Sequence, residues 1–255
     1  MPVGGVALLV VDNALCRIAA HSLAARFPDL VIIVEDQVPR VSLIRGRIKR
    51  FGLAQVAGQL AFIACSRILR RAAAPRIAEI IAASGLNPNW PSGVELIKVT
   101  SVNSPETIAR LRRLAPKVVL VVGTRIISRK VLSSVAAPFI NYHDGITPKY
   151  RGIHGGYWAK AQGDPGNFGV TVHLVDPGID TGDVLYQARL EPSAKDNYAT
   201  FSYLQIAAAL PLLERAAQDA IAGTLTTQKV DLPSLLWSHP TLWGYVATGL
   251  GRGAW

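Results

Sequence analysis

Residues 6–36, VALLVVDNALCRIAAHSLAARFPDLVIIVED, decide the fold. Two short runs rich in β-branched residues, 6–12 and 29–36, flank a segment whose apolar residues recur at helical spacing. A strand, a helix and a second strand in this order form a β-α-β unit, whose two strands lie parallel in one sheet. The stretch therefore predicts an α/β protein built on a parallel sheet.

The same alternation continues along the chain. The strand-like runs VELIKV (94–99) and KVVLVVG (117–123) flank a helix over 104–115, for which Ser104 is the predicted N-cap. The remaining predicted elements are short helices in RKVLSSV (129–135) and HGGYWAKAQ (154–162), strands in FINYH (139–143), GVTVHLVD (169–176) and VLYQARL (184–190), and a long helix over 198–223. The pattern predicts a doubly wound, mostly parallel sheet with helices on both faces.

The size and charge of the chain set broad limits on its function. Its 255 residues, half of them hydrophobic, are enough to bury a core as one large domain or two small ones. The formal net charge of +10 and a pI near 9.9 favour anionic partners. Phosphate-bearing metabolites, nucleic acid and anionic lipid all meet that description, and charge alone does not choose among them.

The cysteine content and the N-terminal stretch indicate a compartment. The chain has two cysteines, Cys16 and Cys65, which excludes a disulfide framework and a cysteine-rich metal site. The first apolar run has no basic leader before it and stops at Asp12, so we interpret it as a strand and not as a signal peptide. These features predict a cytoplasmic protein.

The region 40–76 is basic at both ends and apolar between them, over FGLAQVAGQLAFIACS (51–66). The apolar part is shorter than the roughly 20 residues that cross a bilayer. We favour a half-buried helix with solvated basic ends over a helix lying on a membrane surface, and peripheral membrane association stays the alternative.

The last stretch, 226–255, contains three of the five tryptophans and is predicted to be an aromatic C-terminal extension of a domain over 1–225. We expect its aromatic side chains to pack on that domain. A partner surface, including homodimerisation through these tryptophans, is the alternative.

Two polar side chains near the end of the strand in FINYHDGITPKYRG (139–152) carry the first chemical signal. Asn141 and His143 lie two residues apart, so they project from the same face of the strand. In an open α/β sheet, ligands bind beyond the carboxyl ends of the strands. An amide and an imidazole fixed there suit a reaction that builds negative charge on a carbonyl oxygen.

A carboxylate partner is expected from GVTVHLVDPGIDTGDVLYQ (169–187), which contains Asp176, Asp180 and Asp183. The Pro-Gly pair makes VDPGID a turn after a strand, which places Asp180 on a loop near the strand end. His173 lies within the strand, and its favoured role is a hydrogen-bonded support for the site. His154 begins a helix, where a contact with the site and a capping role both fit.

Together, NYHDGITPKYRGIHGGYWA and GVTVHLVDPGIDTGDVLYQ resemble the folate-dependent formyltransferase family over about residues 117–192. Four features occur in order at compatible spacings: the Asn-x-His pair, the Pro-x-Tyr-x-Gly loop, the Gly-x-x-x-His strand and the Asp-x-Gly turn. The family includes glycinamide ribonucleotide transformylase, the enzyme that formylates methionyl initiator tRNA, and the N-formyltransferases of nucleotide-linked amino sugars. The resemblance implies a Rossmann-like formyltransferase fold.

The resemblance also implies roles for individual residues. Asn141, His143 and Asp180 would be the catalytic trio, with 10-formyltetrahydrofolate as formyl donor and no metal ion. The pteridine-binding stretches of the family correspond to 123–127 and 175–180, which gives as cofactor-binding residues Gly123, Thr124, Arg125, Ile127, Val175, Asp176 and Gly178. Residues in and after the Pro-x-Tyr-x-Gly loop (148–152, the motif loop) would bind the acceptor: Lys149, Tyr150, Arg151 and His154.

The expected acceptor is a small amine that carries phosphate, and we favour a nucleotide-linked amino sugar. The stretch after the first strand, LLVVDNALCRI (8–18), lacks the Gly/Ser-rich loop with which the purine-pathway enzyme grips its substrate phosphate. About sixty residues follow the last motif strand, too few for both the long helix and the extra domain of the tRNA enzyme, so no nucleic acid partner is expected. Solvated surface charge is the favoured interpretation of the basic clusters in 40–76.

Three other functions stay open. Metal-assisted hydrolysis would draw its ligands from His143, Asp144, His154, His173 and Asp176. A hydrolase that releases formate from the same folate would use the same site. A non-catalytic domain would bind a membrane or a protein through the basic helix and the aromatic extension.

Overall fold

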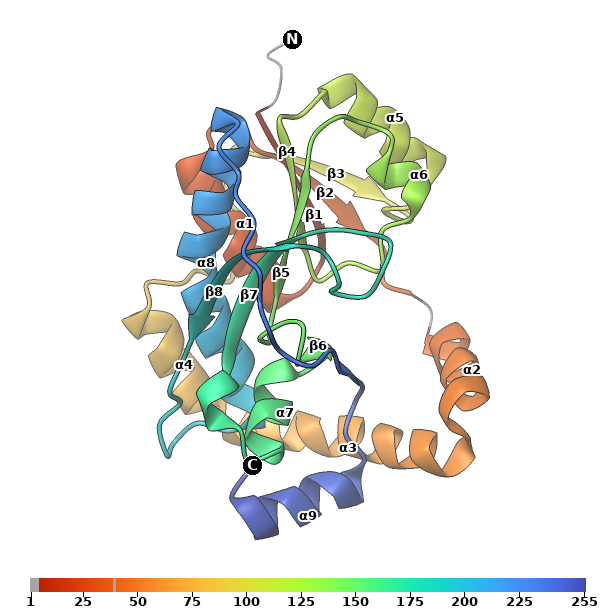
Figure 1. Cartoon of the computed structure of the whole chain (residues 1–255), viewed down its shortest axis with the longest axis vertical. Helices are drawn as coiled ribbons and strands as arrows, with labels where there is room; N and C mark the ends of the chain where they lie inside the picture. The colour runs from red at the N-terminus through yellow and green to blue at the C-terminus, as the bar shows by residue number, and fades with distance from the viewer. Residues whose placement is uncertain (1–4, 39) are drawn as a thin grey trace.

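The computed structural model describes residues 5–38 and 40–255, and a seven-stranded sheet forms its centre (Figure 1). The strands lie in the order β3-β2-β1-β4-β5-β7-β8. Their bounds are β1 (Val6–Val11), β2 (Val31–Glu35), β3 (Glu95–Val99), β4 (Val118–Val122), β5 (Phe139–His143), β7 (Gly169–Leu174) and β8 (Val184–Arg189). The first five in this order are parallel to one another, and β7 runs antiparallel to both of its neighbours, β5 and β8. The predicted mostly parallel sheet is confirmed.

Helices cover both faces of the sheet, as predicted. α1 (Ala14–Arg26) and α8 (Tyr198–Ala222) lie on one face, and α5 (Pro105–Leu114) and α6 (Arg129–Leu132) on the other (Figure 1). Leu8 belongs to the apolar core of the first face and Leu9 to that of the second, and neither is exposed to solvent. Because both faces of β1 are buried, its sequence is a continuous apolar run and does not alternate.

Three helices separate β2 from β3: α2 (Arg40–Phe51), α3 (Leu53–Ala72) and α4 (Ala74–Ala83). Gly52, at φ 81°, makes the turn between α2 and α3. The helix predicted from 51–66 is α3, which buries Val56 and Phe62 and exposes Leu53 and Ile68. Within the described ranges, no helix has both the length and the apolar character to cross a membrane.

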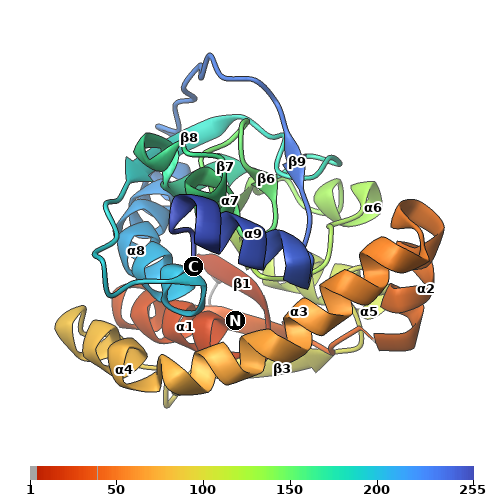
Figure 2. The ribbon, with the colours of Figure 1, turned by 90° about the horizontal axis from the view of Figure 1, so that it is seen from below.

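A third apolar cluster joins α3 to the C-terminal part of the chain. It contains Phe62 and Tyr198, together with Tyr157 from α7 (Gly155–Ala161) and Tyr245 from α9 (Leu242–Arg252). Figure 2 shows α9 lying along α3. A 3₁₀ turn, Pro165–Asn167, follows α7. This cluster lies outside the sheet and attaches the helical insert to the rest of the molecule.

The segment 226–255 also pairs with the motif loop. β9 (Leu236–Trp237) lies parallel to β6 (Arg151–Gly152), which makes a second, two-stranded sheet. Trp237 stacks on Trp158 with ring centroids 4.7 Å apart, as expected for aromatic side chains packed on the domain. Trp243 is different, since 57% of its surface is exposed.

Candidate active site

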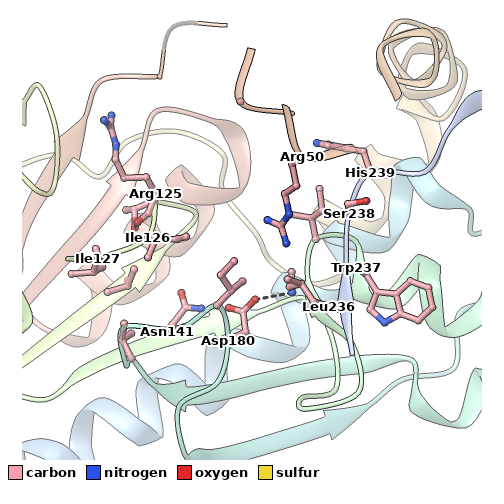
Figure 3. A pocket seen from close by; sticks show the side chains of 18 of the residues that line it. Arg50, Arg125, Ile126, Ile127, Asn141, Asp180, Leu236, Trp237, Ser238 and His239 are labelled. Atoms are coloured by element: carbon pink, nitrogen blue, oxygen red, sulfur yellow. Dashed lines mark hydrogen bonds between the residues drawn. The ribbon is translucent and has the colours of Figure 1, made fainter. Parts of the chain in front are cut away.

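A cavity of about 780 Å³ lies where segments from distant parts of the chain meet (Figure 3). Its walls are the segment after β4, the loop that joins β7 to β8, the helix α2, and the chain around β9. Asn141 and Asp180 both line it. The cavity has the size of a small-molecule site, and two of the three predicted catalytic residues line it.

The amide of Asn141 is oriented by its cross-strand neighbour, His173. His173 Nδ1 lies 2.7 Å from the carbonyl oxygen of Leu174, which can only accept, so Nδ1 carries the proton. The unprotonated Nε2 then accepts a hydrogen bond from Asn141 Nδ2 at 3.1 Å. One N–H of the amide is used in this contact, and the second remains for a ligand in the cavity. His173 thus has the supporting position that its place within the strand predicted.

His143 lies behind the cavity wall and is 5% exposed. Its Nε2 donates to the carbonyl oxygen of Tyr150 at 2.6 Å, and its Nδ1 lies 3.5 Å from Asp180 Oδ2. Nε2 therefore carries a proton, and Nδ1 faces the carboxylate of Asp180. The carboxylate of Asp144 is 3.9 Å from the same Nδ1, and burial raises the pKa of Asp144.

Asp180 lies between these groups, on the loop that follows β7. Its φ is 49°, a conformation that aspartate tolerates better than most residues do. Burial raises the pKa of this carboxyl, but the charge of His143, the ring of His173 at 3.6 Å and the backbone N–H of Gly152 at 2.8 Å together outweigh burial and hold the pKa at about 2. Asp180 is therefore a carboxylate at neutral pH. The structure brings all three members of the predicted trio together, with Asn141 and Asp180 on the cavity surface and His143 behind them.

Most of the predicted cofactor-binding residues also line the cavity: Thr124, Arg125, Ile127, Val175, Asp176 and Gly178. Gly123 lies behind them, at φ 71°, where an added Cβ would come 3.1 Å from Cys16 Sγ. Gly178 and the hydroxyl of Thr181 donate hydrogen bonds to Asp176, which fixes the turn after β7.

The segment after β4 is attached to the end of β2 by Glu35. The carboxylate of Glu35 accepts a hydrogen bond from the backbone N–H of Arg125 at 2.8 Å and pairs with its guanidinium at 2.5 Å. The carbonyl oxygen of Asp36 accepts a further bond from the same guanidinium. The charge of Arg125 is thus balanced within the protein, and the main effect of these contacts is to hold the cavity wall in place.

The four predicted acceptor-binding residues lie off the cavity surface. Lys149 Nζ and the hydroxyl of Tyr150 both contact the carboxylate of Asp164, at 2.7 and 2.8 Å. The guanidinium of Arg151 donates to the carbonyl oxygen of Ile179, on the loop that carries Asp180. His154 contacts His239 Nδ1 at 3.0 Å. In this structure the four residues brace the motif loop.

Other residues that line the cavity were not assigned to the site from the sequence. They come from α2, from α3 and from the chain after β9: Arg47, Arg50, Phe51, Gln59, Ser238 and His239. The basic clusters of 40–76 were expected to be solvated, and most of their side chains are exposed, Arg50 among them. Arg50 nevertheless borders the cavity, together with the half-buried Arg47. The signal available in the sequence was the concentration of arginine beside apolar residues in 40–51.

Over residues 5–38 and 40–255, no group of three or more His, Cys, Asp or Glu side chains is arranged to hold a metal ion. Of the residues considered as metal ligands, His154 contacts His239 and Tyr198, and His173 is bonded to Leu174 and Asn141. Their contacts therefore lie within two separate hydrogen-bonded groups.

Comparison with known proteins identifies the family. The model of the formyl transferase family matches residues 66–203, more than half of the chain, so the chain belongs to the formyl transferase family. A methionyl-tRNA formyltransferase of Anaeromyxobacter sp. (strain K) is 31% identical over 165 residues, which are 58% of this chain and 52% of that protein. The chain thus spans about half the length of this relative.

Solved structures share the fold at low sequence identity. Glycinamide ribonucleotide transformylase 1 from Symbiobacterium toebii has a TM-score of 0.58 at 15% identity, covering 89% of this chain and 92% of that one. An N-formyltransferase from Helicobacter canadensis, in complex with folinic acid and dTDP-3-aminofucose, has a TM-score of 0.55 at 15% identity, covering 91% and 70%. At this level of identity the likeness shows the fold alone.

Proposed function

We propose that this chain transfers the formyl group of 10-formyltetrahydrofolate to a primary amine of a small anionic acceptor, and we favour a nucleotide-linked amino sugar. The observation that carries the proposal is the convergence of the Asn141 amide and the Asp180 carboxylate on one cavity, with His143 held against Asp180. Membership of the formyl transferase family supports this reaction class.

The cavity has features that fit a reduced folate. Apolar side chains of Ile127, Val175 and Ile179 line it beside polar loop backbone, and a flat heteroaromatic ring needs both kinds of surface. The bound folate would supply the formyl carbon. Thr124, Arg125, Asp176 and Gly178 lie on the two loops that would hold it.

The proposed roles of the trio follow from their contacts. The free N–H of Asn141 donates to the oxygen on which negative charge develops, and His143 helps to stabilise that charge from behind the cavity wall. Asp180 keeps the ring oriented and, through a water molecule, would accept the proton that the attacking amine releases. That proton would pass to the folate nitrogen as its bond to the formyl carbon breaks. Because His173 fixes the amide and Gly152 fixes the carboxylate, these donors and acceptors need little reorganisation during the reaction.

Two observations bear on the choice of acceptor. The polar side chains that follow β1 contact other groups of the protein: Asp12 pairs with Arg17, and Asn13 caps α1. A phosphate grip of the purine-pathway kind therefore has no residues there. The Helicobacter canadensis enzyme, which shares the fold, binds an amino sugar linked to dTDP. Glycinamide ribonucleotide and methionyl-tRNA are the competing acceptors.

Calorimetric titration with 5-formyltetrahydrofolate, a stable analogue of the donor, tests the proposal first. We expect the wild-type protein to bind it, and formyl transfer to amino-sugar nucleotides to be lost in Asn141→Ala and Asp180→Asn variants that remain folded. Asp231→Asn, at an exposed position, is the matched control and should keep full activity. Absence of folate binding by folded wild-type protein would overturn the proposal, and formate release without any amine would assign a hydrolase instead.

A further inference from the structure

The helix α2 forms the wall of the cavity that faces the catalytic end. Four residues from about one and a half turns of α2 line the cavity: Gly46, Arg47, Arg50 and Phe51. Figure 3 shows the side chain of Arg50 reaching from α2 toward the space above Asn141 and Asp180. Two guanidinium groups therefore border the same cavity as Asn141 and Asp180.

No carboxylate of the described chain balances these two arginines. None of the ion pairs formed within residues 5–38 and 40–255 includes Arg47 or Arg50. The carboxylates that line the cavity are engaged elsewhere, since Asp176 accepts from Gly178 and Thr181, and Asp180 faces His143. Burial of Arg47 lowers its pKa, which is the cost of holding a charge there without a partner.

The neighbouring polar groups are suited to a ligand with both anionic and hydroxyl groups. Burial and the charges of Arg47 and Arg70 lower the pKa of His239 to about 4, so this ring is neutral and adds no charge to the cavity. Gln59 is 1% exposed and donates to the carbonyl oxygen of His239. Its Oε1 has no partner within the described chain. A ligand hydroxyl at this point would satisfy a buried acceptor that is otherwise unpaired.

We infer that Arg47 and Arg50 form a phosphate-binding end of the cavity and select an acceptor that carries a phosphate or diphosphate group. A guanidinium binds phosphate through two parallel N–H bonds, and two of them on one helix turn match a diphosphate. The assignment to the acceptor rests on the proposed function. The glutamate carboxylates of the folate are the other anionic source, and the test separates the two.

The test is calorimetric titration with inorganic pyrophosphate and with uridine diphosphate. Arg47→Gln/Arg50→Gln removes both charges, and Arg112→Gln/Arg113→Gln removes two exposed charges of α5 as a matched control. We expect uridine diphosphate to bind the wild type and the control with affinities within about two-fold of each other, and the α2 variant at least about ten-fold more weakly. Arg47→Lys/Arg50→Lys keeps the charge but lacks the two parallel N–H donors of a guanidinium. Its affinity for uridine diphosphate should lie between that of the wild type and that of the α2 variant.

A parallel titration with 5-formyltetrahydrofolate identifies the source of the anion. We expect the α2 variant to bind this folate as the wild type does, with an unchanged melting temperature. Equal binding of uridine diphosphate by the wild type and the α2 variant, or no binding by either, would overturn the inference, and so would a selective loss of folate binding. If wild type binds uridine diphosphate through these arginines but binds no folate, the phosphate site stands and the proposed function falls.

Discussion

At the scale of single residues, the site depends on protons whose positions are fixed by backbone carbonyl groups. The carbonyl oxygens of Tyr150 and Leu174 accept from His143 and His173, and so decide which ring nitrogen of each histidine faces the trio. The consequence is that His173 presents a lone pair to Asn141, whereas His143 can present a proton to Asp180.

The acid stability of the protein should reflect Asp180. Because its pKa in the folded state, about 2, lies below the ordinary value of 3.8, its charged form stabilises the fold above about pH 4, and this contribution is lost as the pH falls toward 2. The difference is about 2 kcal/mol. In urea titrations, the free energy of unfolding of wild type should fall by that much more than that of Asp180→Asn between about pH 4.5 and 2. Parallel curves would contradict the shift.

His173 should act by positioning Asn141. In His173→Ala the amide loses the acceptor that orients it, so we expect kcat to fall by about ten-fold to a hundred-fold with a small change in KM for the folate. His173→Gln retains an acceptor and a donor and should recover part of kcat. A purely structural role would lower the melting temperature and leave kcat of the folded fraction unchanged. Steady-state kinetics with both variants decides between these outcomes.

The spacing of Asn141 and His143 predicted two side chains on one face of a strand, and the turn sequence predicted an exposed loop for Asp180. These are local properties, which a sequence expresses directly. The withdrawal of His143 behind the cavity wall is different, because it depends on the path of the loop that places the carbonyl oxygen of Tyr150. The roles of Lys149 and Tyr150 depend on Asp164 in the same way.

At the scale of elements, two residues of β6 connect the motif loop both to the trio and to the C-terminal segment. Gly152 donates its N–H to Asp180, and its strand pairs with Leu236 and Trp237, about eighty residues away. The long strands and helices were predictable because their apolar periodicity extends over five residues or more. β6 and β9 have two residues each and carry no periodicity, so only the folded chain reveals their pairing.

Gly152→Ala should disturb both connections. The position has φ 100°, and an added Cβ would lie 2.2 Å from the carbonyl oxygen of Trp237. We expect a loss of about 3 kcal/mol or more in the free energy of unfolding and a lower kcat, since relief of the clash would shift the backbone N–H that donates to Asp180. Gly163→Ala, at φ 70° with open space around it, is the matched control and should cost about 1 kcal/mol without affecting kcat. Equal effects in chemical denaturation would mean that backbone strain alone matters.

At the scale of the whole molecule, the cavity is assembled from the sheet, from the insert between β2 and β3, and from the C-terminal segment. The sheet was predictable, and its loops carry the residues that the family resemblance implies. The insert and the segment 226–255 supply the opposite wall, and their relation to the sheet is set by a cluster of aromatic side chains drawn from α3, α7, α8 and α9. Such a cluster joins parts of the chain that are far apart in sequence, so no local sequence pattern predicts it.

Tyr245 tests whether the C-terminal segment folds as one unit with the sheet. Its ring lies within 6.0 Å of the rings of Phe62, Tyr157, Tyr198 and Trp255, measured between centroids, and 4% of its surface is exposed. Tyr245→Ala should lower the free energy of unfolding by about 3 kcal/mol or more, within a single cooperative transition. Leu250→Ala, on the same helix and 77% exposed, should change it by less than about 0.5 kcal/mol. If fluorescence of the tryptophans and far-ultraviolet circular dichroism gave separate transitions in Tyr245→Ala, the segment would be an independent unit. Coincident transitions would mean that the sheet and both walls of the cavity form together, so that a ligand bridging the trio and α2 would stabilise the entire chain.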